Sequence, residues 1–208
     1  MSMLLSITRI SPSHVEAIRR DPDCVGDLLD LPEPHSPPEV SKPGFLSRTL
    51  SRIFLARRSD TLPRETFRQR TRELAPVPQS DIYDVDKYWH ILHFLFTGTA
   101  WEGTQPKAFL ASGGSPVGRE LGYGPPRLFE PEELQAISSF LETLTFEEFA
   151  SGYVSESVMD AELYYWRPGS TAEELSADLE TLWAIVGEMR EFLANTAKHG
   201  DGILVEIY

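Results

Sequence analysis

The chain has 208 residues, a formal net charge of -13 and a single cysteine. This length is sufficient for one hydrophobic core and does not require a second. The negative charge argues against a general nucleic-acid-binding protein, because such a surface must attract phosphate. Cys24 has no partner for an internal disulfide, and no apolar run reaches the length that spans a bilayer. We therefore expect a cytoplasmic protein with no nucleic-acid partner and no transmembrane segment.

The charge is unevenly distributed along the chain. Residues 42–72 carry nine basic and two acidic side chains, which gives this segment a net charge of +7. Residues 73–208 carry seven basic and 23 acidic side chains, for a net charge of -16, and residues 1–41 have a net charge of -4. The sequence therefore predicts an acidic body that is interrupted by one basic segment.

The N-terminal residues predict a strand followed by a helix. Residues 3–10 are apolar and β-branched enough for a strand, and Ser11 with Pro12 is typical of a helix N-terminus. We expect that helix to continue to about Arg20. The five prolines between residues 21 and 41 then predict a surface loop, because proline interrupts regular hydrogen-bond ladders.

The basic segment predicts an amphipathic helix, since apolar residues between positions 45 and 54 recur at helical spacing beside arginines. One interpretation is that residues 44–58 contact an anionic membrane surface or an acidic partner. The other is that the segment folds back on the acidic body of its own protein, which the opposite charges favour. With the proline-rich stretch, it forms a predicted insertion at about residues 21–80 of a single domain, residues 1–208.

The C-terminal half predicts helices and a final strand. Pro131 opens a helix with an apolar stripe, and Thr145 and Thr171 each begin a capping box with the glutamate three residues later. The last helix ends before Gly200 and leads into a strand over residues 203–208. The first and last strands are natural partners. The sequence thus predicts an α+β fold, a single domain with several helices packed on a small sheet that includes the N-terminal and C-terminal strands.

Residues 84–97 predict a mostly buried helix that ends at Gly98 and carries a narrow polar stripe. The stripe covers roughly 60° of the helix circumference, and its members are Asp86, His90, His93 and Thr97. One interpretation is a metal-binding or general acid–base cluster, but no HExxH motif accompanies it. The favoured alternative is a pair of neutral histidines that bond backbone carbonyls in residues 98–128. We therefore predict no metal site and no cofactor.

Two motifs and the chain's C-terminal end resemble one protein family. The motifs are DVDKYWHILHFLFTG at residues 84–98 and LGYGPPRLF at residues 121–129, and the final helix runs into GILV at residues 202–205. Together they resemble the YfbM-like family, small bacterial proteins grouped as a domain of unknown function. The resemblance covers the chain from Asp81 onward and, more loosely, the first strand and helix. It implies an α+β domain in the cytosol and no established activity.

The family motifs also define the candidate site residues. The two motifs are expected to line one pocket or one structural polar cluster, whose members are Asp86, Trp89, His90, His93, Thr97, Tyr123 and Arg127. Two departures from the family pattern stand out. Residues 21–80 have no secure counterpart in short members, and the sequence LYYW at residues 163–166 replaces the Ile-Tyr-Pro often found there.

Three hypotheses for the function follow. The acidic body favours a non-enzymatic binding protein, such as an immunity-like protein that neutralises a basic partner. The alternative is a small-molecule-binding domain or enzyme with a pocket around His90, His93 and Arg127, in which the arginine holds an anionic group. In the third hypothesis the domain is a scaffold, and its motifs specify only the fold.

Overall fold

The protein is described by a computed structural model that covers residues 3–30, 75–169 and 171–208. Its centre is a five-stranded antiparallel sheet with the strand order β2-β1-β5-β4-β3. The strands are β1 (Leu5–Ile10), β2 (Ile82–Asp86), β3 (Ser115–Pro116), β4 (Arg127–Phe129) and β5 (Gly202–Ile207). The predicted pairing of the first and last strands is confirmed, with Leu5 opposite Ile207 and Ile10 opposite Gly202. The predicted basic amphipathic segment lies outside the described residues.

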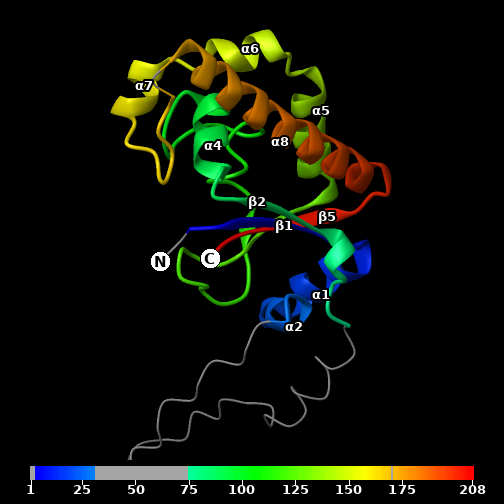
Figure 1. Cartoon of the computed structure of the whole chain (residues 1–208). Coiled ribbons are helices and arrows are strands. Elements are labelled where there is room, and N and C mark those ends of the chain that lie inside the picture. Colours follow the sequence, from blue (N-terminus) through cyan, green and yellow to red (C-terminus); the bar gives the residue numbers. More distant parts are fainter. Residues whose placement is uncertain (1–2, 31–74, 170) are drawn as a thin grey trace, which may run out of the picture.

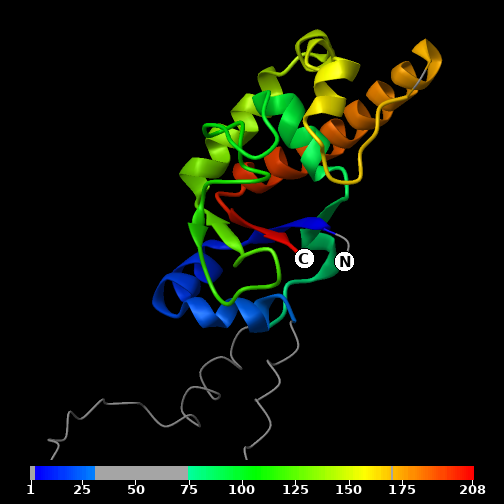
Figure 2. The same ribbon diagram turned by 90° about the vertical axis from the view of Figure 1, so that its left-hand side faces the viewer.

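Helices cover both faces of the sheet (Figures 1 and 2). We call the face toward α4, α5 and α8 the upper face and the face toward α1 and α2 the lower face, as oriented in Figure 1. The described helices are α1 (Pro12–Arg20), α2 (Val25–Leu28), α4 (Trp89–Thr97), α5 (Pro131–Thr143), α6 (Phe146–Ser151), α7 (Ser155–Asp160) and α8 (Ala172–Lys198). Short 3-10 turns occur at Pro22–Cys24 and Gln79–Asp81. The predicted α+β fold with a single domain is confirmed.

The buried apolar residues form two cores, one on each face of the sheet. The alternation of side chains along β1 explains how this strand contributes to both. Successive residues of a strand point to opposite faces, so Leu5 and Ile7 join the upper core while Ile10 joins the lower one. Ser6 and Thr8 also point to the lower face and are buried. Because β1 lies between β2 and β5 and is covered on both sides, it is almost entirely buried.

The predicted caps are present. The Ser11 hydroxyl accepts a hydrogen bond from the His14 amide at 3.3 Å, and Thr145 and Thr171 each form a complete capping box. Gly98 ends α4 with a φ of 78°, a left-handed conformation that strongly favours glycine. Helix starts and stops were therefore readable from sequence wherever a capping residue marked them.

The predicted start of the helix over residues 84–97 was wrong. Residues 84–86 are not helical but complete β2, and α4 begins only at Trp89. The chain leaves the strand through Asp86, whose φ is 56° and whose amide donates to Asp84 Oδ1 at 2.8 Å. That local bond supports a turn, which the regular spacing of polar residues across the junction had concealed.

The proline-rich stretch was predicted to be a surface loop, but its first part is helical. Residues 22–28 form a 3-10 turn and α2, and they bury Cys24, Val25 and Leu28 against the lower face. Pro22 does not prevent this, because proline is compatible with the first turn of a helix.

None of the described helices is both long enough and apolar enough to cross a membrane.

Candidate functional site

His90 uses both ring nitrogens to join three separate segments. Its Nε2 donates to the Ala100 carbonyl at 2.8 Å, and its Nδ1 accepts from the Tyr164 amide at 2.9 Å. A carbonyl can only accept and an amide can only donate, so these bonds require the neutral imidazole with its proton on Nε2. Burial lowers the pKa of His90, and the side chain is sealed from solvent, with 1% of the residue exposed. No lone pair remains on this ring for a metal or a substrate.

His93 makes a matching bond one turn later. Its Nε2 donates to the Glu102 carbonyl at 3.0 Å, and the residue is 0% exposed. Burial lowers the pKa of His93 to about 4, and the charge of Arg127 contributes to the same shift. Its Nδ1 has no hydrogen-bond partner in the described parts of the chain. His93 is therefore held neutral at physiological pH.

Arg127 binds the same loop from the sheet side. Its guanidinium donates to the Phe109 carbonyl at 2.9 Å and to the Leu110 carbonyl at 2.7 Å, with a longer approach of 3.4 Å to the Gly113 carbonyl. Burial lowers the pKa of Arg127 to about 10. The donors that an anionic ligand would need are thus already directed at backbone oxygens.

The remaining candidate residues take separate positions. Trp89 donates from its indole Nε1 to the Met3 carbonyl at 3.2 Å, and Thr97 donates to the His93 carbonyl at 2.8 Å. Asp86 precedes the helix and so does not belong to its polar stripe. Tyr123 is exposed and lines a cavity of about 260 Å³ with Arg127, but neither histidine lines that cavity.

The two motif histidines and Arg127 therefore converge on a loop. His90, His93 and Arg127 all donate to carbonyls of residues 100–113 and hold this segment against α4 and β4. The histidines thus bond backbone carbonyls, as in the alternative that gave them a structural role. This arrangement stabilises a loop that has little regular secondary structure of its own.

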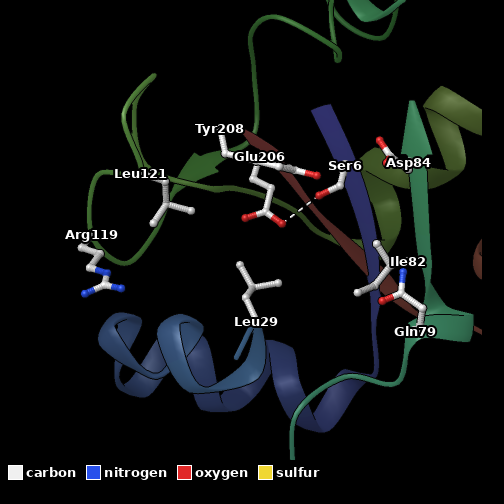
Figure 3. Close-up of a pocket in the computed structure, with 9 residues that line it drawn as sticks. All are labelled: Ser6, Leu29, Gln79, Ile82, Asp84, Arg119, Leu121, Glu206 and Tyr208. Carbon is white, nitrogen blue, oxygen red and sulfur yellow. Dashed lines mark hydrogen bonds between the residues drawn. The ribbon is translucent and has the colours of Figure 1, made fainter. Parts of the chain in front are cut away.

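A second cavity lies on the lower face and was not predicted from sequence (Figure 3). Its volume is about 400 Å³, within the usual range of small-molecule sites. Strands β1, β2 and β5 form one wall of the cavity. Leu29, which follows α2, forms a second wall, and the residues between β3 and β4 form a third. The lining residues are Ser6, Leu29, Gln79, Ile82, Asp84, Arg119, Leu121, Glu206 and Tyr208.

Three polar residues form a row across the sheet at this cavity. Ser6 lies directly opposite Asp84 on β2 and opposite Glu206 on β5. The Ser6 hydroxyl donates to Glu206 Oε1 at 2.8 Å, as the dashed line in Figure 3 shows. Opposed residues on neighbouring strands have Cβ atoms about 5 Å apart, so the strand register alone places a carboxylate on each side of the serine.

The carboxylate of Glu206 is the central charged group of the cavity. Burial raises its pKa, while the Ser6 hydrogen bond acts in the opposite direction. Within the described residues Ser6 is the only hydrogen-bond donor that reaches this carboxylate. The pKa of Tyr208 is also raised, first by burial and then by the negative charges of Asp84 and Glu206.

The described residues contain no group of three or more histidine, cysteine or acidic side chains that could hold a metal ion. The cavity can instead offer the half-buried carboxylate of Glu206, the Ser6 hydroxyl and an apolar surface, with further polar groups from Gln79, Asp84 and Arg119. Sequence reasoning missed it because Ser6 and Glu206 are 200 positions apart. The available signal was Glu206, the one charged residue in an otherwise apolar C-terminal strand.

The comparisons with known proteins identify a family and a similar fold, and neither match has a described function. The model of the family described as "Domain of unknown function (DUF1877)" matches residues 1–206. A similar solved structure is "The Crystal Structure of a Protein of Unknown Function YfbM from Escherichia coli", with 18% identity and a TM-score of 0.61, covering 99% of this chain and 100% of that one. At this identity the likeness shows a shared fold. No curated protein matches the chain. The YfbM-like resemblance is confirmed.

Proposed function

Because the chain belongs to the family described as a domain of unknown function (DUF1877), we propose a function from its own surface: a non-enzymatic, immunity-like protein that binds a basic protein partner. The observation that carries the proposal is the segment between residues 146 and 165, which we call the α6–α7 segment. It combines exposed apolar side chains with an excess of acidic residues.

The α6–α7 segment exposes large apolar side chains. Phe146, Val154, Met159 and Tyr165 are four of the seven exposed large hydrophobic residues in the described chain. Met159 and Tyr165 are 53% and 63% exposed. Exposed apolar groups that gather in one region and have polar neighbours are typical of protein interaction surfaces.

The charge of the segment indicates the kind of partner. It contains five acidic residues and no lysine or arginine, and the acidic residues are Glu147, Glu148, Glu156, Asp160 and Glu162. The wider helical region, residues 131–198, contains fourteen acidic residues and three basic ones. A negative field of this kind steers a cationic partner and speeds its association at low salt.

The position of the segment also suits a partner. Helices α6 and α7 lie at the end of the molecule furthest from α1 and α2 in both ribbon views (Figures 1 and 2). Phe146 packs edge-on against Trp183 of α8, with ring centroids 5.6 Å apart, which fixes one side of the segment to the longest of the described helices. We include a location in the bacterial cytoplasm in the proposal, because the one cysteine forms no disulfide.

A site-specific cross-linking experiment tests the proposal. A photoreactive phenylalanine analogue placed at Met159 should capture one protein of net positive charge in the cells that make this chain. The same analogue placed at Glu16, an exposed position on α1, should not capture it. With the purified partner, affinity should fall steeply between 50 and 300 mM salt, because exposed charges are screened.

A matched pair of triple variants distinguishes the effect of negative charge on this segment from the effect of the net charge of the whole protein. Glu156→Gln with Asp160→Asn and Glu162→Gln should weaken partner binding at least tenfold. Glu16→Gln with Asp23→Asn and Asp27→Asn removes the same charge from the α1–α2 side and should have little effect. Equal effects of the two triples, capture of an acidic protein, or no capture specific to Met159 would each refute the proposal.

A further inference from the structure

The lower-face cavity contains a carboxylate whose charge the described chain does not balance. Ser6 satisfies one oxygen of Glu206, and no lysine or arginine of the described residues forms an ion pair with it. A half-buried carboxylate without a cationic partner loses hydration and gains little in return. This arrangement is unfavourable for the free protein and becomes favourable when a cation enters the cavity.

The walls around Glu206 combine apolar side chains with polar ones. Leu29, Leu121 and Ile82 surround the space into which the carboxylate points, and Tyr208 adds a phenol ring (Figure 3). Ligand sites commonly have this composition, with apolar walls that contribute affinity and a few polar groups that fix the orientation. An aromatic ring near a carboxylate also favours a cation, because its face attracts positive charge.

We propose that this cavity binds a small organic cation, a primary amine carried on an apolar body, with Glu206 as its counter-ion. The ammonium group donates to the free oxygen of Glu206, and the apolar body packs between Leu29 and Leu121. This site lies on the lower face, away from the α6–α7 segment, and does not depend on the proposed protein partner.

The other charged groups of the cavity are consistent with this orientation. Asp84 lies on the β2 side of the cavity and adds negative charge to the same row. Arg119 lies on the opposite side in the view of Figure 3, beyond Leu121. The ammonium group is therefore expected between β5 and β2, and the apolar body is expected to extend toward the side of Arg119.

Three probes of similar size test the charge requirement on the full chain. Phenethylamine, 2-phenylethanol and 3-phenylpropionate present a cation, a neutral hydroxyl and an anion on the same aromatic body. In NMR titrations at pH 7.5 and constant ionic strength, phenethylamine should shift the amide signals of Ser6, Glu206 and Tyr208 in a saturable manner. The alcohol should bind at least tenfold more weakly, and the acid should give no saturable shift.

A variant pair locates the counter-ion. Glu206→Gln should weaken phenethylamine binding at least tenfold, while its side chain can still accept from Ser6. Glu191→Gln makes the same change at an exposed position of α8 and should leave the affinity unchanged. If Glu206→Gln does not fold, the pH dependence of the unmodified chain decides: affinity should fall as the pH drops through the pKa of Glu206.

Several outcomes would overturn the inference. These are the absence of saturable amine binding up to 50 mM, equal affinity for the amine and the alcohol, and an affinity that neither Glu206→Gln nor acidification changes. A depressed pKa of Glu206 in the free protein would do so as well, because it would show that a basic group of the chain itself already pairs with this carboxylate.

Discussion

The two faces of the sheet treat their buried polar residues in opposite ways. On the upper face, His90 and Arg127 direct their donors at backbone carbonyls of the chain itself. On the lower face, Ser6 is buried against Glu206, and the carboxylate behind it faces a cavity of about 400 Å³. The polar groups of the upper face are bonded within the chain, while the Glu206 carboxylate on the lower face is directed at a cavity.

The upper face shows what the motif histidines and Arg127 do in this fold. Residues 100–113 have little regular structure, so their carbonyls need donors from elsewhere. A histidine pair and an arginine in a family motif supply those donors and so specify the fold. Glu206 stabilises no loop, and its raised pKa indicates that burial disfavours its charge.

The largest effect is expected from Arg127→Gln. This change removes the charge-assisted bonds to the Phe109 and Leu110 carbonyls, and a hydrogen bond to a charged group contributes about 1.5 to 3 kcal/mol. We expect the free energy of unfolding in urea to fall by about 3 kcal/mol.

The control for this prediction is Arg20→Gln, a change of the same chemistry at an exposed position of α1. It should alter the free energy of unfolding by less than about 0.5 kcal/mol. Similar values for the two variants would show that Arg127 does not stabilise the loop.

An effect of similar size, which appears only on acidification, is expected from His93. Its pKa is about 4 in the folded protein and about 6.5 when unfolded, so only the unfolded state binds a proton between these values. The contribution of neutral His93 is therefore complete above pH 6.5 and is lost as the pH falls toward 4. It amounts to about 3 kcal/mol between pH 7 and pH 4.

His93→Leu should remove this component, so that its unfolding free energy falls less steeply with acid than that of the unmodified chain. His199→Leu, the same substitution at an exposed residue after α8, is the control for the change of residue type. An unchanged slope in His93→Leu would mean that His93 is not the buried neutral group that the upper face requires.

Much of the fold could be predicted from local chemistry. Ser11, Thr145 and Gly98 mark helix ends through hydrogen bonds or a left-handed φ that depend on a few neighbouring residues. The pairing of the terminal strands was predictable as well, because both are short apolar runs that need a partner. Strand β2 could not be predicted in this way. Asp86 fits the spacing of the polar residues on the following helix, but its backbone, with a φ of 56°, forms a turn between strand and helix.

The site divides in the same way. The bonding of His90 and His93 to nearby carbonyls was one of two alternatives that spacing allowed, since the partners lie about ten residues away. The Ser6–Glu206 pair depends on the register of β1 against β5 and on the place where α2 ends. No local pattern encodes those features, so the cavity required the structure.

The most direct test of this account is one NMR pH titration that follows the imidazole nitrogens and the side-chain carboxyl carbons of the same sample. We predict that both histidines titrate below the ordinary pKa of histidine, His93 at about 4, with the proton of the neutral ring on Nε2, and that Glu206 titrates above the ordinary pKa of a glutamate. Histidines that titrate near pH 6.5 together with a Glu206 pKa below 4 would contradict the account, because the upper face would then be open and the lower face paired.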